Sequence, residues 1–152
     1  MDHGQGLRVH TVAMFASIAL FLLFAAQARP HPEPFAVALD KRFVRDLHDK
    51  KIDDVLTLYT PDAVFVNPDG SEAKGPGLRK LYEQVTTSFD SDLHLKPAHF
   101  ERNGEAAEEN GSYEETLRHR DSGKIDHIHG TFRFGMRREA DGRWRYTRME
   151  WH

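Results

Sequence analysis

Apolar positions in the first half of the chain recur at helical spacing. Every third or fourth residue is apolar over residues 39–47 and again over residues 52–59, with charged residues between them. Residues three and four apart share one face of a helix, so this spacing predicts two amphipathic helices. The second is expected to end at the Thr-Pro-Asp segment 60–62, and a third helix is predicted over residues 78–89.

From residue 93 onward the apolar positions alternate, which is typical of strands. A short apolar strand is already expected at residues 63–66, before a Pro- and Gly-rich loop. The later strands are predicted at residues 93–101, 106–118, 125–138 and 143–152. Asn103-Gly104 and the segments 121–123 and 140–142 supply the turns between them. Pro97 interrupts the first long strand, which suggests a sheet edge or a bulge.

The N-terminal segment has the three-part pattern of a secretory signal peptide. Residues 11–26 are almost wholly apolar, and Ala26-Gln27-Ala28 is a small-x-small cleavage site. The alternative is an uncleaved anchor, but a run of 16 residues is shorter than the roughly 20 that a membrane span needs. We therefore expect a signal peptide at residues 1–28, a Pro-rich linker at 29–34 and a domain at 35–152. The mature protein would be secreted or periplasmic, without a membrane contact.

Composition excludes some partners and chemistry. The formal net charge of −3 argues against nucleic acid as a partner. The chain has no cysteine, so disulfides and cysteine nucleophiles are excluded. We find no phosphate-binding Gly-rich loop and no nucleophile-elbow motif, and we expect no cofactor.

The order of these elements resembles the nuclear transport factor 2-like superfamily, which includes SnoaL-like cyclases and ketosteroid isomerases. The resemblance is carried by residues 55–66, the loop 67–75 and the helix that follows it. Late in the chain it is carried by Gly130-Thr-Phe-Arg-Phe and Asp141-Gly-Arg-Trp144. It implies an α+β fold, a cone of N-terminal helices packed on a curved antiparallel sheet, with a small-molecule pocket between them. The fold hosts enzymes, binding domains and oligomerisation modules alike, so it names no activity.

The resemblance allows one residue-by-residue test. Ketosteroid isomerases need a carboxylate base, and a Tyr and a protonated Asp that donate to the enolate oxygen. In this sequence the base position falls on Asn67, the Tyr position on Phe43 and the Asp position on Gly130. None of the three groups is present, which argues against isomerase chemistry of this type.

Candidate contacts with a ligand come from the helices and the inner face of the sheet. We expect ligand contacts from Tyr59, Phe65, Asn67, Tyr82, Phe132 and Trp151. Asn67 could instead form a turn before Pro68, and the two tyrosines could be core residues whose hydroxyls reach a partner. If the chain is an enzyme, the candidate acid–base groups are His94 or Glu114, acting with Tyr59. A pocket with neutral polar groups and no paired carboxylate favours binding over proton abstraction.

The outer face of the sheet carries histidines and charges. His127 and His129 share one strand face, and the spacing suits a metal ligand pair, but no third ligand is fixed and we expect no metal. Six glutamates gather on one hairpin and six arginines on the next: Glu101, Glu105, Glu108, Glu109, Glu114 and Glu115, against Arg133, Arg137, Arg138, Arg143, Arg145 and Arg148. We expect this surface to be solvated, with opposite charges across adjacent strands, and to serve a homodimer packed sheet to sheet.

These observations predict an exported SnoaL-like domain that binds a small, partly apolar molecule. Two alternatives stay open. One is an acid–base enzyme of the cyclase, dehydratase or hydrolase type acting on such a molecule. The other is an oligomerisation module with an inert pocket.

Overall fold

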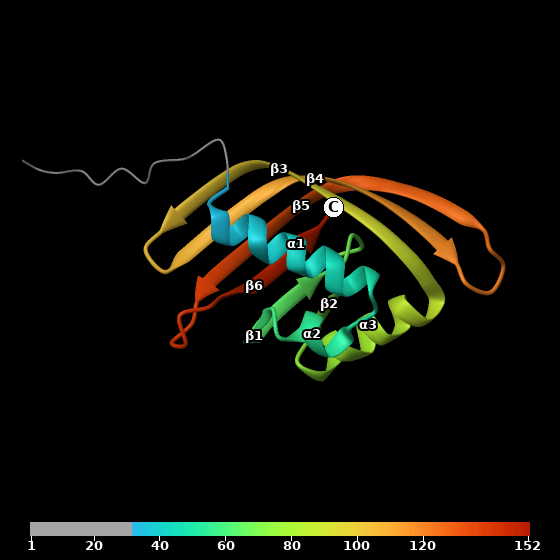
Figure 1. Cartoon of the computed structure of the whole chain (residues 1–152), viewed down its shortest axis with the longest axis horizontal. Helices are drawn as coiled ribbons and strands as arrows, with labels where there is room; N and C mark the ends of the chain where they lie inside the picture. Colours follow the sequence, from blue (N-terminus) through green and yellow to red (C-terminus); the bar gives the residue numbers. More distant parts are fainter. Residues whose placement is uncertain (1–31) are drawn as a thin grey trace, which may run out of the picture.

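The computed structural model describes residues 32–152, and Figure 1 shows their arrangement. The expected signal peptide and most of the expected linker lie outside these residues. The helices are α1 (Pro34–His48), α2 (Ile52–Leu56) and α3 (Pro76–Ser88). The strands are β1 (Tyr59–Val66), β2 (Glu72–Lys74), β3 (Phe89–Asn103), β4 (Ala106–His119), β5 (Ile125–Arg138) and β6 (Trp144–Trp151).

Helix α1 forms because its apolar residues fall on one face. Pro34 occupies the first turn, where its missing N–H costs no hydrogen bond. Arg45 and His48 lie in the last turn, where cations favour the helix dipole. The buried apolar residues of this helix are Ala36, Leu39, Phe43 and Leu47. They belong to the hydrophobic core, and Figure 1 shows helix α1 lying against the concave face of the sheet.

The second helix is shorter than predicted. Helix α2 ends at Leu56, and Tyr59 begins strand β1 instead of closing the helix. The reason is tertiary, since the backbone N–H of Tyr146 donates to the carbonyl of Leu58, 2.8 Å away. The pairing between β1 and β6 shifts register between Tyr59 and Val64, which accommodates Pro61 in the strand.

The sheet has six strands in the order β2-β1-β6-β5-β4-β3. It curves over the helices (Figure 1) and does not close, because β2 and β3 are its two edges. The predicted long strands and their turns are confirmed, as is the bulge at Pro97 on an edge strand. The predicted α+β fold, with N-terminal helices packed on a curved sheet, is confirmed. Strands β1 and β6 run parallel, so the sheet is mixed and not wholly antiparallel. Strand β2 was not predicted because it is only three residues long.

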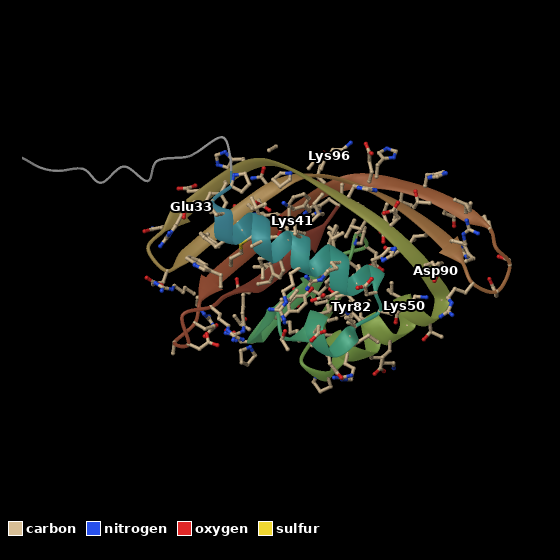
Figure 2. The ribbon with its side chains drawn as sticks, viewed as in Figure 1. Glu33, Lys41, Lys50, Tyr82, Asp90 and Lys96 are labelled. Carbon is tan, nitrogen blue, oxygen red and sulfur yellow. The ribbon has the colours of Figure 1, made fainter. Side chains whose placement is uncertain are left out.

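Helix α1 is fixed to β3 at both ends. Near its start, Glu33 accepts a hydrogen bond from Arg102, 2.9 Å away. Just after its end, Lys50 forms an ion pair with Asp90, and Figure 2 shows these two side chains close together. These contacts set the path of α1 along the edge of the sheet. Among residues 32–152, no helix is both long and apolar enough to cross a membrane.

Candidate functional site

A groove lies between helix α1 and the edge strand β3. Its volume is about 550 Å³. The helix contributes Val37, Asp40, Lys41, Val44, Arg45 and His48, and the other lining residues are Pro32, Asp92, Leu93, His94, Leu95 and Pro97. The helical set recurs every three to four residues because one stripe of α1 faces β3. We call this feature the α1–β3 groove.

Asp40 is a buried ionisable residue in the lining of the α1–β3 groove. It lies on the inner side of α1 and is 6% exposed. The hydroxyl of Tyr146, on β6, donates a hydrogen bond to Oδ1 of Asp40 over 2.5 Å. Tyr146 is itself fully buried, and the burial together with the charge of Asp40 keeps the pKa of its hydroxyl well above the usual value. Tyr146 therefore remains a hydrogen-bond donor to Asp40.

A second carboxyl, Glu109 on β4, lies beside Asp40 and has no exposed surface. Among the described residues, neither oxygen of Glu109 nor Oδ2 of Asp40 has a donor if both groups are ionised. Two carboxylates only accept hydrogen bonds, so one proton is needed to join them. With a proton on Glu109, the two groups form a hydrogen bond that leaves one negative charge on Asp40. We call Asp40 and Glu109 the carboxyl pair.

The pKa values of the carboxyl pair agree with a shared proton. Burial, and after it the hydrogen bond and charge of Asp40, raises the pKa of Glu109 to about 9. Burial also raises the pKa of Asp40, while the hydrogen bonds from Glu109 and Tyr146 lower it part of the way back. Glu109 therefore holds the proton at neutral pH. Raised carboxyl pKa values of this kind gather at functional sites.

The carboxyl pair overturns two sequence-based expectations. A paired carboxylate was not expected, and Glu109 was expected on a solvated surface. The alternation of β4 instead turns Glu109 and Glu115 inward, and Glu115 is part-buried beside Ser91. Burial raises the pKa of Glu115, and the Ser91 hydrogen bond lowers it in part. The expected cross-strand charges are present elsewhere, as in the 2.7 Å contact between Arg133 and Glu108.

A sequence signal for the pair did exist. Glu109 is the register partner of Phe134, which lies two residues after the predicted inner-face residue Phe132 and so shares its face. Directly opposed residues in an antiparallel pair share a face, so Glu109 also had to point inward. Asp40 lies one turn before the buried Phe43 on the same helix face. Predicting the inward position of Glu109 required the register of the β4–β5 hairpin, which the sequence analysis did not assign.

The two tyrosines that were predicted to contact a ligand are hydrogen-bonded to each other. The hydroxyls of Tyr59 and Tyr82 form a hydrogen bond, and that of Tyr59 also contacts the sulfur of Met149. Both rings are buried, and burial is the first cause of their raised pKa values. Tyr82, labelled in Figure 2, lies on α3, and its ring centroid is 6.3 Å from that of Phe43 on α1. Neither tyrosine lines the α1–β3 groove.

The other predicted ligand contacts belong to the core or to a turn. Phe132 and Trp151 are buried, and the rings of Phe65 and Trp151 lie 6.2 Å apart. The amide of Asn67 donates to Oγ of Ser71 over 3.0 Å and closes the loop between β1 and β2. Asn67 therefore has the turn-forming contacts. None of these four predicted residues lines the α1–β3 groove.

The predicted acid–base residues are not brought together. His94 borders the α1–β3 groove and contacts Asp92 at 3.2 Å. Glu114 is the register partner of His94, but it is exposed on the outer face and accepts a 2.6 Å hydrogen bond from Lys96. Tyr59 is enclosed in the core. The structure thus offers Asp40, and not these three residues together, as the groove's buried ionisable group.

The positions compared with ketosteroid isomerases contain no catalytic group. Phe43 is buried in the core. A Cβ added to Gly130 would lie 2.0 Å from the carbonyl oxygen of His152 and 2.8 Å from the Tyr113 ring. Glycine is needed there because the backbone of His152 and the ring of Tyr113 approach so closely.

The histidine pair on β5 faces outward, as predicted. His127 and His129 are exposed, and Nδ1 of His127 lies 3.1 Å from the hydroxyl of Thr116. Within residues 32–152, no three His, Asp or Glu side chains gather in a way that could hold a metal ion.

Solved structures share this fold. A ketosteroid isomerase-like protein from Erwinia carotovora atroseptica superposes with a TM-score of 0.68 and 22% identity, over 79% of this chain and 95% of its own. A nuclear transport factor 2-like superfamily protein from Salmonella enterica serovar Typhimurium gives 0.69 and 19%, over 77% and 87%. A similar protein with a cystatin-like fold from Novosphingobium aromaticivorans gives 0.64 and 18%, over 77% and 78%. No known protein-family model and no curated protein matched the sequence.

Proposed function

We propose that this chain, whose domain has the nuclear transport factor 2-like fold, is an exported protein that binds a small, partly apolar molecule in the α1–β3 groove. The single observation that carries the proposal is the buried Asp40 in the lining of a largely apolar groove. Ligand sites of proteins are commonly apolar hollows of about 300–1,000 Å³ with a few polar groups that orient the ligand. The α1–β3 groove has this size and this composition.

The apolar walls of the groove and the carboxyl group of Asp40 have different roles in ligand recognition. Val37 and Val44 on the helix face Leu93 and Leu95 on the strand, and their burial by a ligand supplies affinity. Asp40 supplies orientation, because Tyr146 and Glu109 hold its carboxyl in place. The site proposed here differs from the cone interior that the resemblance implied.

The carboxyl pair favours a second candidate, an acid–base enzyme that acts on the bound molecule. A carboxylate with a raised pKa in an apolar surrounding is a stronger base than an exposed one. In this candidate Asp40 takes a proton from the substrate, while Glu109 and Tyr146 are positioning residues. One of the similar structures is a ketosteroid isomerase-like protein, which supports this candidate, although the positions compared with ketosteroid isomerases hold no catalytic group here.

Binding is tested with the neutral fluorescent dye prodan, whose emission changes on leaving water. We expect saturable binding of one dye per chain. The Val44→Arg variant should weaken it at least about tenfold, since it places a long cation against the apolar wall. Ile128→Arg is the matched control, because Ile128 is an exposed apolar residue on β5 and is not in the groove lining. Equal binding by both variants and the unmodified protein would refute the location.

A further inference from the structure

We propose that the α1–β3 groove takes an organic cation: an amine whose ammonium group lies at Asp40 and whose apolar part lies against Val44 and Leu93. This inference rests on the proposed binding function and names its ligand class. The carboxyl pair has a buried negative charge and, among the described residues, no cation as a partner.

The carboxyl pair carries a negative charge without a cation. Among residues 32–152, no Lys, Arg or His side chain forms an ion pair or hydrogen bond with Asp40 or Glu109. Tyr146 donates to one oxygen of Asp40, and the proton of Glu109 is the remaining donor available to the pair. A buried charge without a partner is strongly unfavourable. An ammonium group supplies both the opposite charge and three N–H donors.

The other buried carboxylate on α1 shows the contrast. Asp46 is as deeply buried as Asp40, but Arg45 lies 2.8 Å from it and Arg42 lies 3.4 Å from it. The charge of this buried carboxylate is therefore balanced by arginines of the chain itself. Within the described residues, the chain supplies no cation to Asp40, which lines the groove.

The cations around the groove do not exclude an amine. Arg45 is neutralised by Asp46, and His48 and His94 each lie 3.2 Å from a carboxylate, that of Asp49 and that of Asp92. Lys41 has no ion pair within the described part of the chain, but it is exposed on α1 (Figure 2), where water and salt screen its charge. The negative charge of Asp40 is buried and is screened far less. An anionic ligand in the groove would be repelled by that charge.

The test compares three probes with the same six-carbon chain: hexylamine, hexan-1-ol and hexanoate. Their binding to the purified protein is followed by NMR shifts of backbone amides along α1 and β3. We expect hexylamine to bind about tenfold or more tightly than hexan-1-ol, because hydrogen bonds to a charged group are the stronger kind. Hexanoate should bind most weakly. Equal binding of amine and alcohol, or tightest binding of hexanoate, would overturn the inference. Absence of groove binding by all three would instead contradict the proposed function.

Matched variants identify the carboxylate. Asp40→Asn should abolish the preference for the amine and leave binding of the alcohol within about twofold. Asp92→Asn removes a carboxylate that is also in the lining but is exposed and paired with His94, and it should keep the preference. Loss of the preference in both variants, or in neither, would refute the role of Asp40.

A pH titration also tests whether Asp40 causes the amine preference, and it does so without a variant of Asp40. The titratable and charged groups that face Asp40 or the groove are Lys41, Arg45, His48, Asp92, His94, Glu109 and Tyr146. Burial raises the pKa of Asp40, so the amine preference should decrease as the pH falls and Asp40 gains a proton. The double variant His48→Gln, His94→Gln removes the two histidines of the lining. An amine preference that does not decrease at acid pH in this double variant would contradict the inference.

Discussion

Replacing Glu109 with Gln should remove much of the pH dependence of stability. The side chain of Gln has the same shape, carries no charge at any pH and can donate a hydrogen bond to Asp40. In the native protein Glu109 binds a proton in the folded state that it releases on unfolding at neutral pH. The folded pKa is about 9, and the ordinary value is 4.5. Between these values the folded state holds one more proton than the unfolded state, so stability falls as the pH rises.

The magnitude follows from the slope of about 1.4 kcal/mol per pH unit for one proton. From pH 5 to pH 8 the native protein should lose up to about 4 kcal/mol of unfolding free energy through Glu109. The Glu109→Gln variant should lose far less over the same range. The raised pKa of Asp40 acts in the same direction in both proteins, so it does not produce the difference.

The assay is urea denaturation of both proteins at pH 5, 6, 7 and 8, followed by tryptophan fluorescence. Glu101→Gln is the matched control, because Glu101 is exposed on β3. Its stability should follow the native curve. Parallel curves for the native protein and Glu109→Gln would refute the claim that Glu109 is protonated in the fold.

Three further predictions concern the fold and its surroundings. Gly130→Ala should lower the melting temperature through a loss of about 1–3 kcal/mol or more, since its Cβ would overlap the His152 carbonyl. Gly77→Ala should not, because its Cβ would lie at an ordinary contact distance of 3.9 Å from the Cβ of Ala73. Mass spectrometry of the protein secreted by a bacterial host should find an N-terminus at Arg29, and a full-length form held in the membrane would contradict this. Light scattering should give about twice the monomer mass. A monomer at high concentration would exclude the sheet-to-sheet dimer.

Local patterns in the sequence predicted most of the fold. The helical spacing of α1 and the alternation of β5 depend on single elements, and both were read correctly. The errors came where two distant segments decide the outcome. Tyr59 was placed on a helix because the pairing of β1 with β6 cannot be read from residues 52–66 alone.

The candidate site was harder to predict for the same reason. The site combines residues from three elements: Asp40 from α1, Glu109 from β4 and Tyr146 from β6. Each is next to a polar residue in the sequence, so the sequence alone suggests a surface position for it. Glu109 follows Glu108, which does lie on the solvated face. Only the register of the sheet decides which of these two glutamates is buried.

The most direct test of the account is a pH titration of the side-chain carboxyl carbons by NMR. The variants Asp40→Asn and Glu109→Gln assign the two signals. We predict that Glu109 titrates with a pKa of about 9 and that Asp40 titrates above the ordinary range, with each signal responding to substitution of the other. If both carboxyls titrate independently at ordinary values near 4, the buried pair does not hold a proton beside the α1–β3 groove, and the account is wrong.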